Sequence, residues 1–301
     1  MNASPPITDP RQQRLGVVYG ASAYLWWGFI AVYFKVVGSV APVEILAHRV
    51  VWSLLFLGIL LGARRRLGAC LALLRDARTT ATMALTAILI AANWGLFIWA
   101  VGAGRLVEAS LGYFINPLVN VMLGVVFLGE RLRRAQAAAV ALAAAAVAWL
   151  TVSQGRLPWI ALVLAFSFGT YGLLRKRARP SGVEGLALET LLMAPLAVAF
   201  LVWRDRQGLL AFGHAGWGMS LLLALAGPVT ALPLVWFAEG ARRLRYATMG
   251  FLQYVTPTLQ FLLAVVAFGE PFARGRALGF VLIWTALALY TVDTARSLAR
   301  R

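Results

Sequence analysis

The sequence predicts an all-α, polytopic membrane protein with ten transmembrane helices, built as two inverted five-helix repeats. Three observations lead to this prediction: the apolar composition, the distribution of basic residues and an internal repeat. Of the 301 residues, 61% are hydrophobic and only 13% are charged, whereas about a quarter of the residues in a soluble domain are charged. Apolar runs of about 20 residues recur along the chain, and each is long enough to cross about 30 Å of hydrocarbon. Helices are expected because a helix satisfies its own backbone groups inside the bilayer.

Each apolar run defines one expected span. The spans cover residues 15–35, 43–62, 80–101, 106–128, 134–152, 157–175, 183–203, 217–238, 246–268 and 274–293. Residues 1–14 are polar and contain proline, so we expect a disordered cytoplasmic tail followed by an uncleaved first span. The first five-helix repeat is expected over residues 15–152, the second over 153–295, and a short cytoplasmic tail over 296–301.

The basic residues indicate the orientation. Nearly all of them lie in the tails and in short loops between apolar spans, so the net charge of +17 is a topology signal and not evidence for a nucleic-acid partner. The segments on the N-terminal side of the membrane carry 20 Lys and Arg residues, and those on the other side carry seven. This bias places both termini in the cytoplasm, which requires an even number of spans. We expect a membrane protein surrounded by lipid.

Metal, cofactor and enzyme chemistry are not expected. The single cysteine, Cys70, falls in an expected cytoplasmic loop, so no intrachain disulfide can form. Two histidines without HExxH or CxxC spacing do not indicate a metal site. No set of nucleophile, base and acid is visible, which disfavours a membrane enzyme.

An internal repeat appears when the chain is shifted by 140 residues. Residues 110–152 align with residues 250–292 without a gap, and thirteen of the 43 positions are identical. The informative matches are Pro117 with Pro257, Gly129 with Gly269, Glu130 with Glu270 and Arg134 with Arg274. Because each half holds five spans, an odd number, the second half must cross the membrane upside down. Inverted repeats of this kind are typical of secondary transporters, whose substrate site lies near the midplane between the halves.

The second span contains a cluster of polar residues. Glu44, His48 and Trp52 are spaced by four residues and share one helical face, and Arg49 lies beside it. Intramembrane ionisable residues usually face the protein interior or a water-filled cavity. One interpretation is recognition of an anionic or carboxylate-bearing substrate, or a proton-linked gate. The alternative is an Arg49 that snorkels outward and pairs with Glu44 or Glu108.

Polar residues also surround the two prolines of the repeat. Proline inside a helix removes a backbone hydrogen bond and frees a carbonyl group, so Pro117 and Pro257 are candidate hinges. The candidate substrate-binding residues on these and neighbouring spans are Asn93, Trp94, Tyr113, Asn116, Asn120, Gln253, Tyr254, Thr256 and Gln260. Two interpretations remain open: these side chains line a cavity, or they hydrogen-bond between helices as interhelical glue while the prolines act as hinges.

Small residues indicate close helix packing in the first and last spans. Gly16 and Gly20 form one GxxxG motif, and Gly275 and Gly279 form another. Such motifs let two helices approach closely. They are compatible with a homodimer and equally with packing inside one chain.

Several of these stretches resemble the RarD-type permeases of the EamA group, in the drug/metabolite transporter superfamily. The resemblance extends over nearly the whole chain. It is carried by Trp26-Trp27-Gly28, Glu44-Ile45-Leu46-Ala47-His48-Arg49, Asn93-Trp94-Gly95, the segment from Glu108 through Asn116-Pro117 and Asn120 to Gly129-Glu130-Arg131-Leu132, and Gln253-Tyr254 with Thr256-Pro257-Thr258.

The resemblance implies a ten-helix permease of the plasma membrane (the bacterial inner membrane), with a central cavity between two repeats. The family name is linked to chloramphenicol sensitivity, and relatives export amino acids and other metabolites. The expected function is therefore secondary transport, by alternating access, of a small organic solute: export of an amino-acid-like metabolite or of a drug such as chloramphenicol. A channel or a non-transporting membrane scaffold is the alternative.

Overall fold

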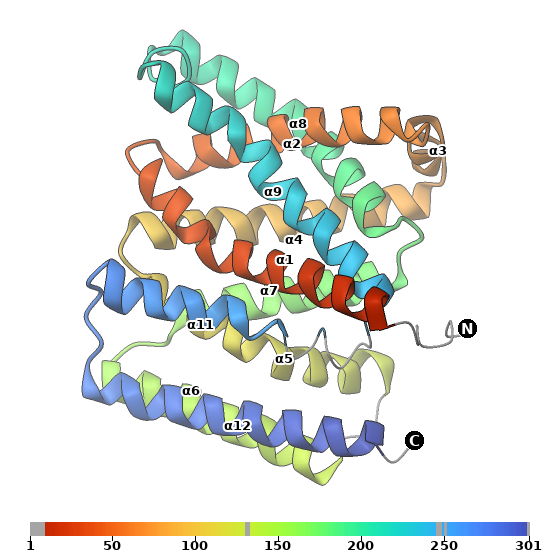
Figure 1. Cartoon of the computed structure of the whole chain (residues 1–301). Coiled ribbons are helices and arrows are strands. Elements are labelled where there is room, and N and C mark those ends of the chain that lie inside the picture. The colour runs from red at the N-terminus through yellow and green to blue at the C-terminus, as the bar shows by residue number, and fades with distance from the viewer. Residues whose placement is uncertain (1–9, 130–132, 245–248, 250–251, 300–301) are drawn as a thin grey trace.

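The computed structural model describes residues 10–129, 133–244, 249 and 252–299 (Figure 1). The regular elements in this part of the chain are all helical. They are α1 (Pro10–Val36), α2 (Pro42–Ala63), α3 (Leu67–Ala72), the 3-10 helix η1 (Leu73–Arg75), α4 (Ala77–Gly102), α5 (Leu106–Leu128), α6 (Arg134–Gln154), α7 (Trp159–Arg177), α8 (Gly182–Arg206), α9 (Trp217–Arg243), α11 (Val255–Leu262), the π-helix η2 (Leu263–Ala267) and α12 (Arg274–Ala299).

Eight of the described helices are long and apolar enough to cross a bilayer. They are α1, α2, α4, α5, α6, α8, α9 and α12. Two further apolar segments accompany them: α7, which ends in the basic run 175–177, and the shorter continuous segment formed by α11 and η2. The chain is therefore a multi-pass, all-helical membrane protein.

Several helices continue past the expected spans. Helix α1 begins at Pro10, so residues 10–14, expected to be disordered, are helical. Gln12 accepts a hydrogen bond from Arg243 at 3.2 Å, which ties this first turn to α9. Helix α12 likewise extends to Ala299, through most of the expected C-terminal tail. The physical reason is that hydropathy reports the length of chain inside hydrocarbon, whereas a helix can continue into water with polar side chains.

Two further expectations differ from the structure. Cys70, expected in a loop, is buried in the short helix α3. The ninth span was expected over residues 246–268, but residues 245–248 and 250–251 lie outside the described residues. Described helix α11 begins at Val255 and passes into a π-helix, where Phe268 N donates to Leu263 O.

Helices from the two halves of the chain pack against each other. Helix α1 lies against α9 and α11, α2 against α8 and α9, α4 and α5 against α7, and α6 against α12. The beginning of α1 and the end of α12 lie at the same end of the bundle (Figure 1). The GxxxG motifs are used inside this one chain, because Gly16 faces Arg243 and Leu244, and Gly279 faces Leu150 of α6.

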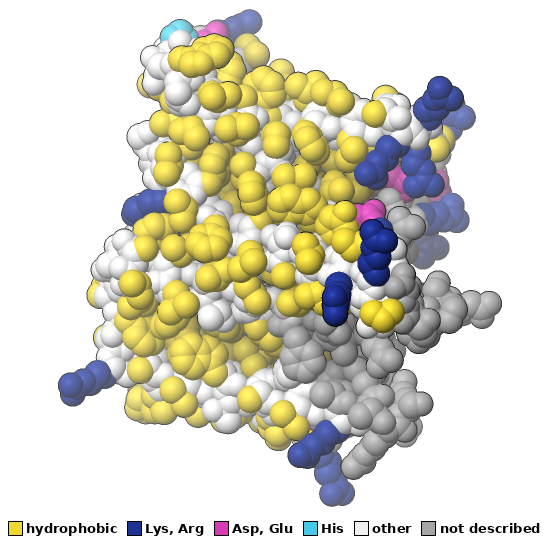
Figure 2. Space-filling view, in the orientation of Figure 1, with side chains coloured by type: hydrophobic (Ala, Val, Ile, Leu, Met, Phe, Trp, Pro, Cys, Tyr) yellow, Lys and Arg dark blue, Asp and Glu magenta, His cyan; other side chains and the backbone are white. Residues whose placement is uncertain are grey.

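The surface has the character that a bilayer requires. In the view of Figure 2, hydrophobic side chains cover the middle of the bundle, while Lys and Arg side chains gather at its two ends. Large apolar side chains that point outward include Ile59, Ile88, Leu196 and Val266. A lipid environment accounts for so much exposed apolar surface.

The repeated Gly129 and Gly269 adopt the same backbone conformation. Their φ angles are 65° and 66°, in the left-handed region that favours glycine. Gly129 is the C-cap of α5, and Gly269 follows η2. The repeat match therefore marks two equivalent helix ends.

Candidate functional site

Arg49 lies at the junction of four helices. It comes from α2 and is buried, and its guanidinium carbon lies 3.8 Å from the ring centre of Trp94 (α4) and 5.6 Å from that of Phe34 (α1). Tyr33 (α1) and Tyr113 (α5) are close enough to interact with it electrostatically. The aromatic rings offset part of the cost of burying the cation.

Arg49 has no carboxylate partner in the described part of the chain. Its Nε atom is buried, and no described residue forms a hydrogen bond with it. The alternative interpretation, in which Arg49 pairs with Glu44 or Glu108, is wrong because both carboxylates are engaged elsewhere. Glu108 pairs with Arg105 and accepts a hydrogen bond from Ile160 N at 3.2 Å. An unpaired buried cation is costly, so this position favours an anionic group.

Glu44 connects α2 through hydrogen bonds to α8 and to the segment that follows α8. It is 0% exposed, and its Oε2 accepts hydrogen bonds from Arg204 at 2.7 and 3.2 Å. Its Oε1 accepts from Ala211 N at 2.7 Å. Both carboxylate oxygens are therefore satisfied by groups more than 150 residues away in sequence.

His48 and Trp52 share the predicted face and contact each other. The Trp52 Nε1 donates to His48 Nδ1 at 3.3 Å, and both rings lie against Phe212 from the α8–α9 connection. The His48 Nε2 is buried and has no hydrogen-bond partner among the described residues. Next to them, Ser53 Oγ is also buried without a hydrogen-bond partner in the described ranges. The α2 face thus presents several unsatisfied polar atoms near Arg49.

Asn93 connects three helices. Its amide nitrogen donates to Leu164 O at 3.0 Å and to Ser167 Oγ at 2.9 Å, both on α7. Its amide oxygen accepts from the Tyr113 hydroxyl of α5 at 3.2 Å. These bonds link α4, α5 and α7, and they hold Tyr113 beside Arg49.

The two asparagines beside Pro117 have different surroundings. Asn116 is buried, and its Oδ1 has no hydrogen-bond partner in the described part of the chain. Asn120, one turn later, is exposed, and its Oδ1 would lie 3.1 Å from a Cβ added at Gly169 of α7. Pro117 itself is buried inside α5, and because it lacks an N–H it leaves the Tyr113 carbonyl without its helical donor.

The equivalent residues around Pro257 mostly hold α11 in place. Thr256 donates to Tyr24 O of α1 at 2.8 Å, and Gln260 donates to Trp27 O at 3.1 Å. The Gln260 Oε1 is buried, and none of the described residues donates a hydrogen bond to it. Tyr254 accepts from Thr291 of α12 at 3.5 Å. Gln253, half-buried, precedes it in the turn that leads into α11.

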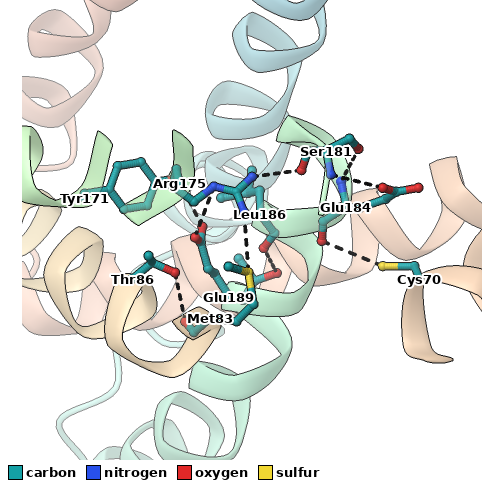
Figure 3. Close-up of polar contacts among 10 residues, drawn as sticks. Cys70, Met83, Thr86, Tyr171, Arg175, Ser181, Glu184, Leu186 and Glu189 are labelled. Carbon is teal, nitrogen blue, oxygen red and sulfur yellow. Dashed lines mark hydrogen bonds and ion pairs between the residues drawn. The ribbon is translucent and has the colours of Figure 1, made fainter. Parts of the chain in front are cut away.

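A second polar cluster was not predicted. Glu189 of α8 is 0% exposed, and its Oε1 lies 3.7 Å from Arg175 Nε of α7. Its Oε2 accepts from the Tyr171 hydroxyl at 3.2 Å. Figure 3 shows Arg175 between Glu189 on one side and Ser181 on the other. The signal was present in the sequence, since Glu189 is an acidic residue inside an apolar span, and Arg175 is the last residue of the span expected over 157–175.

The fold and the polar groups buried within it define a class: a multi-helix membrane protein with ionisable residues inside the bilayer-spanning bundle. The model of the EamA-like transporter family matches residues 14–152 and again residues 157–292. The chain belongs to this family.

Named relatives agree with this assignment. The chain is 48% identical to Protein RarD of Streptomyces exfoliatus, over 96% of this chain and 92% of that protein. It is 45% identical to an uncharacterized transporter of Vibrio cholerae, over 95% and 94%, and 36% identical to the Chloramphenicol-sensitive protein RarD of Pseudomonas aeruginosa, over 95% and 96%. A crystal structure with 25% identity superimposes with a TM-score of 0.58 and covers 95% of this chain and 99% of the other. The family and these names indicate a membrane transporter rather than an enzyme.

Proposed function

We propose that the chain is a secondary transporter that exports a small organic solute by alternating access, with Arg49 binding an anionic group of that solute. The observation that carries the proposal is a buried guanidinium with aromatic neighbours and no acidic partner among the described residues. A solute carboxylate would supply the missing charge and accept hydrogen bonds from Arg49. An amino-acid-like metabolite fits this chemistry. Chloramphenicol, for sensitivity to which one relative is named, carries no anionic group, so as a substrate it would accept hydrogen bonds from Arg49 through its neutral polar groups.

We further propose ten spans in two inverted repeats, covering residues 15–152 and 153–295. The double match of the family model supports this division. The helix contacts also come in related pairs. In the two proposed repeats, α1 corresponds to α7, α4 to α9 and α5 to α11. The α1–α9 contact therefore corresponds to the α7–α4 contact, and the α5–α7 contact to the α11–α1 contact, and all four are present. The substrate site would then lie between the halves, near Pro117 and Pro257.

Two ion pairs whose acidic residues are related by the repeat suggest how access alternates. Glu44 and Glu184 are 140 residues apart, and each lies in the first turn of its helix. Glu44 pairs with Arg204 at 2.7 Å, and Glu184 pairs with Arg66 at 3.8 Å with the Arg66 side chain 67% exposed. We propose that these ion pairs hold α2 and α8 together at opposite ends of their contact. The pair at the Arg204 end is the stronger one, and the pair at the Arg66 end is the weaker one.

The orientation that we propose has both termini in the cytoplasm of a bacterial inner membrane. The excess of basic residues on the side of the termini supports it. The Arg66–Glu184 pair would then face the cytoplasm, and the Arg204–Glu44 pair would face outward. This arrangement corresponds to a state closed on the outside.

The test is transport by purified protein in liposomes loaded with a mixture of labelled amino acids or with chloramphenicol. Replacing Arg49→Gln removes the charge and leaves a shorter, neutral, hydrogen-bonding side chain. It should reduce the initial rate by about tenfold or more, because a hydrogen bond to a charged group contributes about 1.5–3 kcal/mol. Arg105→Gln is the matched control, since Arg105 already has Glu108 as its partner. Equal rates for Arg49→Gln and the parent protein, at equal membrane insertion, would show that the site is wrong.

A further inference from the structure

Glu189 and Arg175 form a buried pair whose geometry is incomplete. The two side chains are 0% and 12% exposed, yet their closest approach is 3.7 Å, beyond hydrogen-bond distance. The Glu189 Oε1 has no hydrogen-bond partner among the residues that the structure describes. By contrast, the buried Glu44 accepts hydrogen bonds on both oxygens, and its distance to Arg204 is 2.7 Å. Two buried acids on neighbouring helices are thus held in different ways.

Arg175 is anchored by groups other than Glu189. Its Nη2 donates to Ser181 O at 2.8 Å, and its Nη1 contacts Met83 Sδ at 3.4 Å (Figure 3). The guanidinium lies directly over Gly185, where a Cβ would approach it to 1.9 Å. Arg175 therefore keeps its position without a direct hydrogen bond to the carboxylate, and a proton on Glu189 would not leave Arg175 without partners.

The other surroundings of Glu189 are neutral. From α7 it faces Arg175 and Tyr171, and from α4 it faces Thr86. Helices α2 and α9 contribute apolar side chains to this region, Leu57 and Ala231 among them. Cys70 of α3 bonds instead to Glu184 O, more than one helical turn away. Arg175 is thus the single cation facing this carboxylate among the described residues.

We propose that Glu189 is a proton-binding site that couples proton movement to the transport cycle. The proton, taken from water at the end of the bundle that carries Ser181, adds to Oε1 and forms an O–H bond, and no other bond changes. A buried carboxyl group without full charge compensation can accept a proton where exposed carboxylates stay ionised. Once Glu189 is neutral, its attraction to Arg175 is lost, which weakens one link between α7 and α8. This inference rests on the proposed transport function, but its first test does not.

The first test uses the proton itself as the probe. Infrared titration of the purified protein in lipid nanodiscs, between about pH 9 and pH 5, should reveal a protonated-carboxyl band that grows as the pH falls, in a range where exposed carboxylates remain ionised. The band should be absent in Glu189→Gln and present in Glu184→Gln, whose carboxylate lies on the same helix in the exposed pair with Arg66. The same band in Glu189→Gln, or no band in the parent protein, overturns the proposal.

A second variant keeps the test valid if Glu189→Gln does not fold. Tyr171→Phe retains the carboxyl group and removes the hydroxyl that donates to its Oε2. The band should persist and shift in frequency. An unshifted band would assign it to another carboxyl group and would contradict the proposal.

The second test separates coupling from solute binding. Glu189→Gln in liposomes should still move labelled solute down its concentration gradient, but its rate should not respond to an imposed pH gradient that changes the rate of the parent protein. If Glu189→Gln still responds, Glu189 is not the coupling site, and the Arg49 proposal is unaffected. If instead Arg49→Gln transports normally, the proposal that Arg49 binds the solute is wrong. The infrared titration then still decides whether Glu189 binds a proton.

Discussion

The ion pairs at the two ends of the α2–α8 contact give a quantitative prediction. Glu44→Gln removes the negative charge and preserves the size of a side chain that is 0% exposed. The amide oxygen can replace one acceptor, but the charge-assisted bonds to Arg204 at 2.7 and 3.2 Å are weakened. Removing one partner of a fully buried pair costs about 3–5 kcal/mol.

The expected cost for Glu44→Gln is smaller than that limit, for two reasons. The Arg204 side chain is 19% exposed, so water can solvate part of its charge. Arg204 also keeps its hydrogen bond to Leu209 O at 2.6 Å. We therefore expect a loss of about 2–3 kcal/mol in the free energy of unfolding, within the range for hydrogen bonds to charged groups.

Glu184→Gln is the matched control at the opposite end. Its partner Arg66 is 67% exposed at 3.8 Å, and an exposed pair contributes about 0–1 kcal/mol. Glutamine also preserves the acceptor that receives Ser181 N at the beginning of α8. The assay is unfolding of each variant in mixed micelles titrated with sodium dodecyl sulfate, followed by circular dichroism. Equal losses for the two variants, or a loss below about 1 kcal/mol for Glu44→Gln, would refute the reasoning from burial.

Two further predictions concern packing and thiol chemistry. Gly227→Ala on α9 places a Cβ 2.3 Å from the Trp52 carbonyl oxygen of α2, a backbone atom that cannot move aside. The variant should therefore lose about 1–3 kcal/mol of unfolding free energy, measured by thermal unfolding. In the control Gly58→Ala the new Cβ has no described atom within 4 Å, so this variant should be neutral or slightly stabilised. Burial raises the pKa of the Cys70 thiol, and Glu184 raises it further. The reactive thiolate is therefore scarce at neutral pH, and its fraction grows only as the pH rises toward that pKa. The control is Gly68→Cys, at an exposed position, in a Cys70→Ser background. Maleimide should label Cys70 at least about tenfold more slowly than this control cysteine, as measured by mass spectrometry. Equal labelling rates would contradict the burial of Cys70.

The sequence predicted the helices well because the signal for each is local. The span expected over 43–62 is helix Pro42–Ala63, and the span over 106–128 is Leu106–Leu128. Every residue inside hydrocarbon must bond within its own helix, so an apolar run of sufficient length determines the element without knowledge of its neighbours. The ends were less accurate, as Pro10 and Ala299 show, since water outside the bilayer does not stop a helix.

The partners of the buried charges were not predictable in the same way. Arg49, His48 and Asn93 were recognisable as intramembrane polar residues, but whether Arg49 pairs with Glu44 depends on where Arg204 lies, 160 residues after Glu44. Whether a polar side chain bonds to a neighbouring helix also varies from residue to residue. Asn93 donates a hydrogen bond to α7, whereas the Oδ1 of Asn116 accepts none from the described residues.

The sequence by itself determined the helical membrane architecture, the basic bias of one side, and the repeat that relates Gly129 to Gly269. Only the tertiary structure decided that Glu44 pairs with Arg204, while Arg49 has no acidic partner in the described chain. It also decided that Arg175 lies beside Glu189 without a hydrogen bond to it. The reason is the range of the interactions. Hydrophobic length acts along one helix, whereas the pairing of buried charges is set by which helices the packing brings together.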